Sequence, residues 1–259
     1  MATALALAAE SGLSIDRTRL AQICQQAENE FVGMRCGIMD QFISLHGRVN
    51  HALMLDCRSL QFELVPIPES VKLVICNTGV KHKLAGGEYN RRREECEVAV
   101  RSLAKALPGI RALRDVSEGE LEQHRELLPQ VVYKRARHVV KENARVLDGM
   151  EALRAGDLQR FGECMAESHE SLRDLYEVSC AELDVMVELA NRQPGVYGAR
   201  MTGGGFGGAT ISLVDAQLAG TFAESMASAY QKETGIVPTI LVCMPADGAS
   251  AVERSELPV

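Results

Sequence analysis

Apolar residues recur at alternating steps of three and four along several stretches of the chain, the spacing of an amphipathic helix. Leu20, Cys24, Ala27 and Phe31 follow this spacing and predict a helix over residues 16–31, with Ser14 as its N-cap. A second stripe predicts a long helix that opens at residues 86–87, and residues 117–191 are helical in pattern almost throughout. The apolar residues 1–10 predict a buried helix.

Short stretches rich in Val, Ile and Leu, bounded by turn residues, predict strands instead. They cover residues 51–57, 62–67, 71–76, 196–201, 209–214 and 239–244. A helix capped by Asp215 is predicted between the last two strands. Strands separated by helical blocks indicate an α+β fold. Pro66 and Pro68 predict a boundary near residue 68, so that residues 1–68 and 69–259 form two domains.

The composition excludes several classes of function. The 259 residues carry a formal net charge of −7, so no basic field is available to hold nucleic acid or an anionic membrane. No apolar stretch reaches the roughly 20 residues that a membrane-spanning helix needs. The 8 cysteines form no C-x-x-C pair, and most lie in apolar stretches. This usage is typical of a reducing compartment and predicts a cytoplasmic protein.

Two acidic residues are candidates for chemistry, one in the predicted helix over residues 16–31 and one at a predicted helix start after Gly37. Asp40 follows Gly33 and Gly37 and is predicted in the first turn of a helix. The positive end of a helix favours an ionised carboxylate, which is then available as a base, although such a residue also serves as a purely structural helix start. Glu28, four residues after Cys24, is either a metal ligand or a surface carboxylate.

A glycine-rich segment between two predicted strands is the next candidate. Its glycines are Gly203, Gly204, Gly205, Gly207 and Gly208. Such a run allows positive φ and close approach of backbone N–H groups to a ligand, and a wide hairpin turn is the alternative. Residues 77–89 join a strand to a helix, where ligand contacts are common. Tyr89 there either points into a cleft or belongs to the core. The run Arg91-Arg92-Arg93 spreads over three helix faces and predicts a solvated surface.

Taken together, these segments resemble the galactokinases of the GHMP small-molecule kinase superfamily. The similar segments are residues 26–33, 36–44, 51–60, 80–93, 137–140, 167–173, 176–180, 195–208 and 246–249. The resemblance implies a GHMP kinase fold. In it, residues 1–68 are the remnant of a ribosomal-S5-like N-terminal domain, and residues 69–259 are a ferredoxin-like C-terminal domain with inserted helices.

The resemblance also implies a reaction, the ATP-dependent phosphorylation of D-galactose at its anomeric hydroxyl with Mg²⁺ as cofactor. Asp40 falls on the family's catalytic aspartate and, with Gly37 and Tyr89, among its substrate-binding residues. Glu28 falls on the Mg²⁺ ligand. The run from Gly203 to Gly208 falls on a glycine loop that lines the active site.

Two family motifs are not found in this sequence. One is G-R-x-N-L-I-G-E-H-x-D-Y, which supplies sugar contacts, and the other is G-L-S-S-S-A, which wraps the ATP phosphates at a helix N-terminus. Residues 47–50 copy only the first four letters of the former. We therefore expect the chain to be incomplete for catalysis. The alternatives are a non-catalytic sugar-sensing or protein-binding module, and a kinase for N-acetylgalactosamine or another sugar.

Overall fold

The computed structural model describes residues 1–81 and 85–251, which divide into two compact units. The first unit comprises Met1–Ile67 together with the segment from Met244 onward, and the second unit is Pro68–Cys243. The sequence predicted one domain over residues 69–259, whereas the described residues 244–251 pack in the first unit. Backbone hydrogen bonds hold them there: Asn50 N–H donates to the Pro245 carbonyl at 3.2 Å and Ala249 N–H to the Ser44 carbonyl at 2.7 Å.

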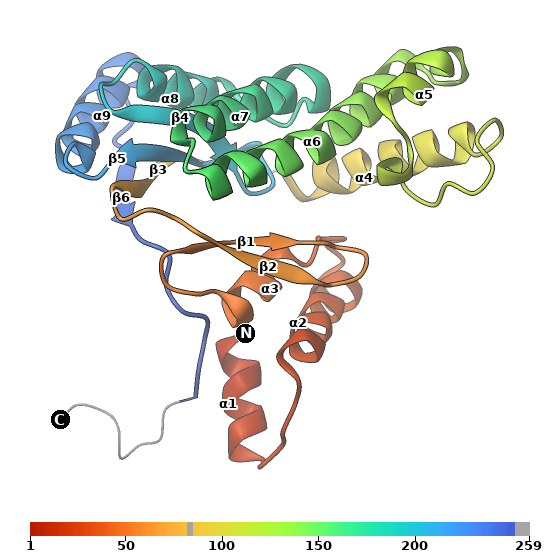
Figure 1. The fold of residues 1–259 in the computed structure, drawn as a ribbon, viewed down its shortest axis with the longest axis horizontal. Coiled ribbons are helices and arrows are strands. Elements are labelled where there is room, and N and C mark those ends of the chain that lie inside the picture. The colour runs from red at the N-terminus through yellow and green to blue at the C-terminus, as the bar shows by residue number, and fades with distance from the viewer. Residues whose placement is uncertain (82–84, 252–259) are drawn as a thin grey trace. The chain divides into compact units, whose positions relative to one another are not determined.

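The first unit is a small helical layer beside a two-stranded sheet (Figure 1). Its elements are α1 (Ala2–Glu10), α2 (Arg17–Gln26), the π-helical turn η1 (Ala27–Val32), α3 (Met39–His46), β1 (His51–Leu55) and β2 (Phe62–Pro66). The strands β1 and β2 pair antiparallel. The core consists of Leu20, Ala21, Ile38, Phe42 and Leu45, against which Leu53 and Leu55 of β1 pack. This core fixes α3 against α2.

Three details of the first unit differ from the sequence-based expectations. The helix α1 forms, but only Ala8 in it is buried and Leu7 is 63% exposed, so the expectation of a buried helix was wrong. The N-cap of α2 is Asp16, whose carboxylate accepts the Arg19 N–H at 2.9 Å, and not Ser14. The helix predicted to residue 31 changes from α to π geometry at Ala27.

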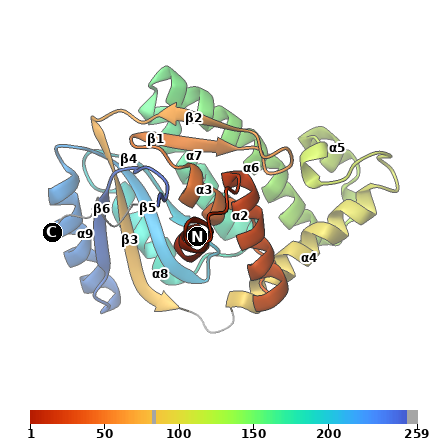
Figure 2. The same ribbon diagram turned by 90° about the horizontal axis from the view of Figure 1, so that it is seen from below.

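The second unit is built on a four-stranded antiparallel sheet of order β4-β5-β3-β6. The strands are β3 (Val71–Lys81), β4 (Val196–Thr202), β5 (Gly207–Asp215) and β6 (Thr239–Cys243). Figure 2 shows β3 between β5 and β6. Helices connect β3 to β4 and β5 to β6, which gives the β-α-β-β-α-β succession of a ferredoxin-like fold. The predicted α+β class and ferredoxin-like domain are confirmed.

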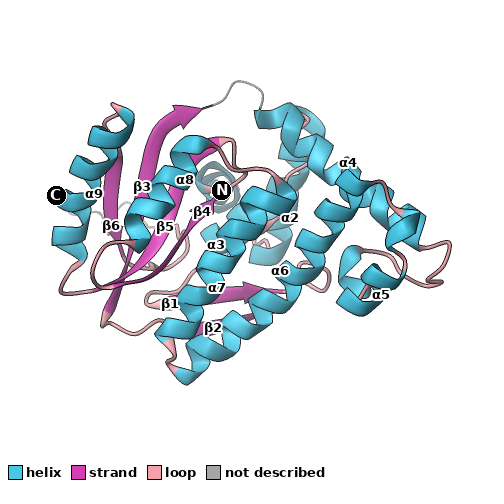
Figure 3. Cartoon of the chain, turned by 90° about the horizontal axis from the view of Figure 1, so that it is seen from above, coloured by secondary structure: helices cyan, strands magenta, loops and turns pink. Residues whose placement is uncertain are grey.

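Two helices, α8 (Ala181–Asn191) and α9 (Ala219–Thr234), cover one face of this sheet (Figure 3). Their buried side chains, among them Met186 and Phe222, pack on Val74 and Cys76 of the central strand. The helix after β5 was expected to be capped by Asp215. Instead α9 begins after Leu218, and Asp215 Oδ1 accepts the Gln217 N–H at 2.8 Å in the preceding turn.

The helices inserted between β3 and β4 form a second core of their own. They are α4 (Ala85–Leu103), η2 (Leu113–Asp115), α5 (Glu118–Gln123), η3 (Arg125–Leu127), α6 (Gln130–Ala155), α7 (Leu158–Ser171) and the π-helical turn η4 (Leu172–Tyr176). The core lies between α4, α5 and α6 and includes Leu103, Leu121 and Val132. In the described ranges 1–81 and 85–251, no helix has the length and apolarity needed to cross a membrane.

The helix α7 crosses β4 at a pair of glycines. A Cβ atom added to Gly162 would lie 1.9 Å from the Tyr197 carbonyl oxygen, and one added to Gly198 would lie 2.1 Å from the Gly162 carbonyl oxygen. The two backbones therefore touch directly, with no side chain between them.

Candidate functional site

The candidate acidic residues lie on two helical segments of the first unit, η1 and α3. Glu28 is half-buried in the π-helical turn η1, which ends at Gly33 in the left-handed conformation with φ of 81°. Asp40 is exposed in the first turn of α3, as predicted, and Gly37 is exposed just before it. π-Helical turns are frequent at functional sites because they re-aim side chains within a helix.

A residue that the sequence analysis did not single out, Gln41, connects these two segments. Its side chain is 8% exposed, and its amide nitrogen lies 3.5 Å from Glu28 Oε2 and 3.8 Å from Cys36 Sγ. Its amide oxygen is buried and has no hydrogen-bond partner among the described residues. The amide next to Asp40 thus donates to the carboxylate of Glu28, which fixes that carboxylate relative to the start of α3.

Glu28 and Asp40 present oxygen atoms, the donors that Mg²⁺ prefers. Within residues 1–81 and 85–251 no group of three or more His, Cys, Asp or Glu side chains is placed to hold a metal ion. A Mg²⁺ ion that accompanies a nucleotide needs only one or two protein carboxylates, because phosphate oxygens and water complete its octahedron. The half-exposed carboxylate of Glu28, held from one side by Gln41, fits that requirement.

In the second unit, the glycine loop between β4 and β5 has a backbone conformation that residues other than glycine rarely adopt, although Phe206 within it also has a positive φ of 60°. Four of its five glycines have positive φ: Gly203 at 81°, Gly205 at 83°, Gly207 at 114° and Gly208 at 89°. A Cβ atom on Gly205 would lie 2.2 Å from the Val178 carbonyl oxygen. The same oxygen accepts the N–H of Phe206 at 2.7 Å. The loop is therefore fastened to the segment that follows η4.

Tyr89 in the first turns of α4 lies against this loop. A Cβ atom on Gly204 would be 3.5 Å from Tyr89 Cδ2, an ordinary van der Waals contact. Tyr89 is half-buried. The structure thus brings Tyr89 and the glycine loop together in the second unit, while in the first unit Gln41, the neighbour of Asp40, contacts Glu28. Residues 82–84 of the strand-to-helix segment lie outside the described residues.

Two buried arginines hold the segment beneath the glycine loop. Arg92 is 6% exposed, and it donates to the carbonyls of Tyr176 at 2.7 Å and Glu177 at 2.8 Å. Arg135 is 3% exposed and donates to Glu95 at 2.9 Å and to the Glu177 carboxylate at 2.7 Å. Glu177 itself has φ of 54°, a left-handed conformation that these contacts maintain.

The expectation of a solvated surface at Arg91-Arg92-Arg93 was therefore wrong for Arg92. Consecutive helix residues point about 100° apart, so one of three can face inward. Arg92 does so because Glu88 and Glu95, one turn away on each side, pair with its guanidinium at 3.3 and 3.6 Å. These i,i+4 and i,i+3 carboxylates were the signal in the sequence that could have identified it.

A buried histidine lies beneath η4. His138 of α6 is 5% exposed, its Nδ1 is 2.9 Å from Ser171 Oγ, and its ring stacks on Tyr176 at 4.5 Å. Burial lowers the pKa of His138 to about 4. The imidazole is therefore neutral near pH 7 and takes a proton in the folded protein only in acid.

This histidine should make the fold sensitive to mild acid. In the unfolded chain His138 takes up a proton below a pH of about 6.5, whereas in the folded protein it stays neutral down to about 4. Protonation therefore favours the unfolded chain, and the free energy of unfolding falls as the pH drops below about 6.5. Between pH 7.5 and 5.0 we expect the loss from this group to be about 2 kcal/mol. Urea unfolding of the wild type and of His138→Gln at both pH values measures it.

The variant His138→Gln should be less stable at pH 7.5 but should lose about 2 kcal/mol less than the wild type on acidification. His124→Gln, a half-buried histidine on the loop after α5, is the matched control and should keep the pH dependence of the wild type. If the wild type and His138→Gln lose the same free energy of unfolding between pH 7.5 and 5.0, His138 is not the group responsible.

Comparisons with known proteins find matches to both units of the chain. The family model described as "GHMP kinases N terminal domain" matches residues 1–48, and "GHMP kinases C terminal" matches residues 150–232. The galactokinase of Roseiflexus sp. (strain RS-1) is 50% identical over 246 residues, which are 95% of this chain and 63% of the relative. The galactokinase of Homo sapiens is 49% identical over 233 residues, 90% of this chain and 57% of the relative.

Among solved structures, Lactococcus lactis galactokinase complexed with galactose superposes with a TM-score of 0.91 at 35% identity, over 96% of this chain and 64% of that chain. The mevalonate kinase of L. major in complex with R-mevalonate has a TM-score of 0.55 at 17% identity over 95% of this chain and 63% of that chain, a likeness of fold alone. The chain spans less than two thirds of the length of each of these galactokinases.

Proposed function

Because this chain belongs to the GHMP kinases, we propose that it is part of a galactokinase, an enzyme that transfers the γ-phosphoryl group of ATP to the anomeric hydroxyl of D-galactose. The observation that supports this most strongly is the 50% identity to a named galactokinase over 95% of the chain. The likeness to the galactose complex at a TM-score of 0.91 favours galactose as the acceptor. The 8 cysteines, all of them within the part of the chain that the structure describes, form no disulfide, which accords with a place in the cytoplasm.

In this proposal Asp40 accepts the proton of the anomeric hydroxyl as the hydroxyl oxygen bonds to the γ-phosphorus. The bond from that phosphorus to the bridging oxygen of ADP breaks, so the products are galactose 1-phosphate and ADP. The position of Asp40 at the start of α3 suits this role, since the helix N-terminus favours the ionised carboxylate that a base requires.

Glu28 is the residue we assign to Mg²⁺, with Gln41 orienting its carboxylate. Mg²⁺, when bound there, would neutralise negative charge on the ATP phosphates. In the second unit, we assign Tyr89 to contact with the sugar and the glycine loop to lining the site with backbone N–H groups. The positive φ values of that loop allow such groups to approach a ligand closely.

We further propose that these 259 residues are not sufficient for turnover, because the motif assigned to the ATP phosphates does not occur in them. The purified chain should form no galactose 1-phosphate above the blank in an assay with ATP and Mg²⁺. A fusion that places the N-terminal region of the Roseiflexus galactokinase before residue 1, called here the completed protein, should form it readily. Turnover by the 259 residues alone would refute the insufficiency.

A sugar panel on the completed protein separates the alternatives. Preference for D-galactose supports the proposal, and preference for N-acetylgalactosamine would replace it with another sugar kinase. A completed protein that is folded but transfers phosphate to no sugar would favour the non-catalytic binding module.

A further inference from the structure

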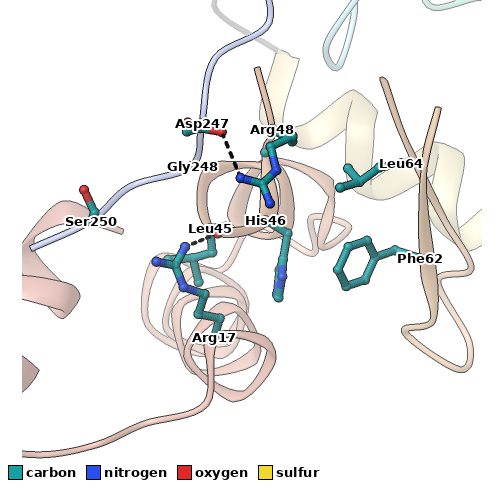
Figure 4. Close-up of a pocket in the computed structure, with 10 residues that line it drawn as sticks. Arg17, Leu45, His46, Arg48, Phe62, Leu64, Asp247, Gly248 and Ser250 are labelled. Carbon is teal, nitrogen blue, oxygen red and sulfur yellow. Dashed lines mark hydrogen bonds and ion pairs between the residues drawn. The ribbon is translucent and has the colours of Figure 1, made fainter. Parts of the chain in front are cut away.

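The first unit contains a pocket of about 490 Å³ that none of the proposed catalytic roles uses (Figure 4). It lies at the C-terminal end of α3, where Leu45, His46 and Gly47 line it, and α2, β2 and the segment after Met244 complete its walls. Asp40 is at the opposite end of the same helix, six positions or about 9 Å from His46. Its volume is in the range of sites that take small organic ligands.

Two arginines bring positive charge to one side of this pocket, as Figure 4 shows. Arg17 of α2 donates from Nη1 to the Leu45 carbonyl at 2.5 Å, which places its guanidinium at the rim. Arg48 lies on the same side, with Nη1 3.9 Å from Asp247 Oδ1. That carboxylate oxygen also accepts the Val49 N–H at 3.1 Å. Among the described residues that line the pocket, the two arginines face one acidic side chain, that of Asp247.

The other side of the pocket is apolar and firmly packed. His46 stacks on Phe42 with ring centroids 4.2 Å apart, and Phe62 lies 4.8 Å from the His46 ring. Burial lowers the pKa of His46, so this ring is neutral near pH 7 and forms part of the aromatic wall. Leu64 extends the wall along β2. A ligand that fills the pocket therefore meets guanidinium groups at one end and apolar surface at the other.

The wall formed by the terminal segment is held in one position. Gly248 N–H donates to the Gly47 carbonyl at 2.8 Å, and a Cβ atom on Gly248 would lie 2.6 Å from the backbone carbonyl of Leu45. This close approach fixes the backbone of the terminal segment beside Gly47. A preformed site of this kind needs little ordering of the protein when a ligand binds.

We propose that this pocket binds a small phosphate monoester, with the phosphate between the guanidinium groups of Arg17 and Arg48 and the organic part against Phe62 and Leu64. A phosphate monoester carries nearly two negative charges and three acceptor oxygens, which matches two planar guanidinium forks. A neutral sugar lacks the charge, and inorganic phosphate lacks the apolar part. The proposal does not depend on the galactokinase reaction, and its test uses no turnover.

A fluorescent reporter can locate the binding. The sequence contains no tryptophan, so Phe62→Trp places a single emitter in the pocket wall. Phe31→Trp, at a side chain that is 93% exposed and does not line the pocket, is the matched control. Phenyl phosphate is the probe, and inorganic phosphate and phenol represent its two halves. We expect phenyl phosphate to change the emission of Phe62→Trp and not that of Phe31→Trp, and to bind at least tenfold more tightly than either half.

Charge substitutions then test the two arginines by calorimetric titration of phenyl phosphate into the full chain with native Phe62. Arg48→Gln should weaken binding at least tenfold. The fold should be retained because the Arg48 side chain is exposed, and circular dichroism checks this. Arg17→Lys, which keeps the charge but not the planar guanidinium with its paired N–H donors, should weaken binding severalfold. Arg19→Gln on the same helix, which does not line the pocket, should leave it unchanged. Equal loss in Arg48→Gln and Arg19→Gln, or equal affinity for phenyl phosphate and inorganic phosphate, would overturn the proposal.

Discussion

Replacing Gly162 with alanine is expected to lower the free energy of unfolding by about 3 kcal/mol or more. The added methyl group would lie 1.9 Å from the Tyr197 carbonyl oxygen, and backbone atoms cannot move aside as a flexible side chain can. Either α7 must lift away from β4 or the strand must bend. Both responses disturb the sheet, because β4 pairs with β5 along its length. The gain in helix propensity from glycine to alanine, at most about 1 kcal/mol, is too small to offset this.

Urea unfolding monitored by circular dichroism measures this loss. Gly220→Ala is the matched control, since Gly220 lies in α9, is exposed, and has no atom within 4 Å of an added Cβ. The control should be neutral or more stable than the wild type by a few tenths of a kcal/mol up to about 1 kcal/mol. A Gly162→Ala protein as stable as the Gly220→Ala protein would show that α7 and β4 are not in direct backbone contact.

This glycine pair illustrates what the amino-acid sequence could not predict. Gly162 and Gly198 each interrupt a well-patterned element, and only the crossing of that helix over that strand explains both. The elements themselves were predictable because hydrophobic spacing is local. The pairing of Asn77 in β3 with Ala209 in β5 is not local, since more than a hundred residues separate them.

The change to π geometry at Ala27 was missed for a related reason. The apolar spacing from Leu20 to Phe31 continues through the turn, so the pattern predicts one uninterrupted helix. In the structure Phe31 is 93% exposed, and the side chains from Ala27 onward follow the wider turn that ends at Gly33. Hydrophobic period alone does not distinguish these two geometries over six residues.

In the candidate site, too, some residues could be predicted from the sequence and others could not. Asp40, Glu28, Tyr89 and the glycine loop could be singled out because their types and spacing are visible in the sequence. Gln41 and Arg135 could not, because their significance comes from burial and from partners elsewhere in the chain. Gln41 meets Glu28 across 13 positions, and Arg135 meets Glu95 and Glu177 across 40 and 42. Such residues position the chemistry without carrying a motif of their own.

In the completed protein, Asp40→Asn is expected to lower kcat by about 10²- to 10⁴-fold, the range that a positioned general base contributes. Asparagine has the shape of aspartate but cannot accept the proton of the sugar hydroxyl. KM for galactose and for ATP should change no more than a few fold, because the loss falls on the transition state. Asp40 is exposed, so the fold should be retained, at a cost below about 1 kcal/mol for the lost charge at the helix start.

The measurement is steady-state kinetics of galactose 1-phosphate formation, with circular dichroism and unfolding midpoints recorded on the same preparations. Asp157→Asn is the control, because Asp157 is an exposed N-cap of α7 and asparagine caps a helix about as well as aspartate. It should leave kcat and stability unchanged. If Asp40→Asn retains kcat within a few fold of the wild type while folding normally, Asp40 is not the base, and the proton of the anomeric hydroxyl must leave by another route.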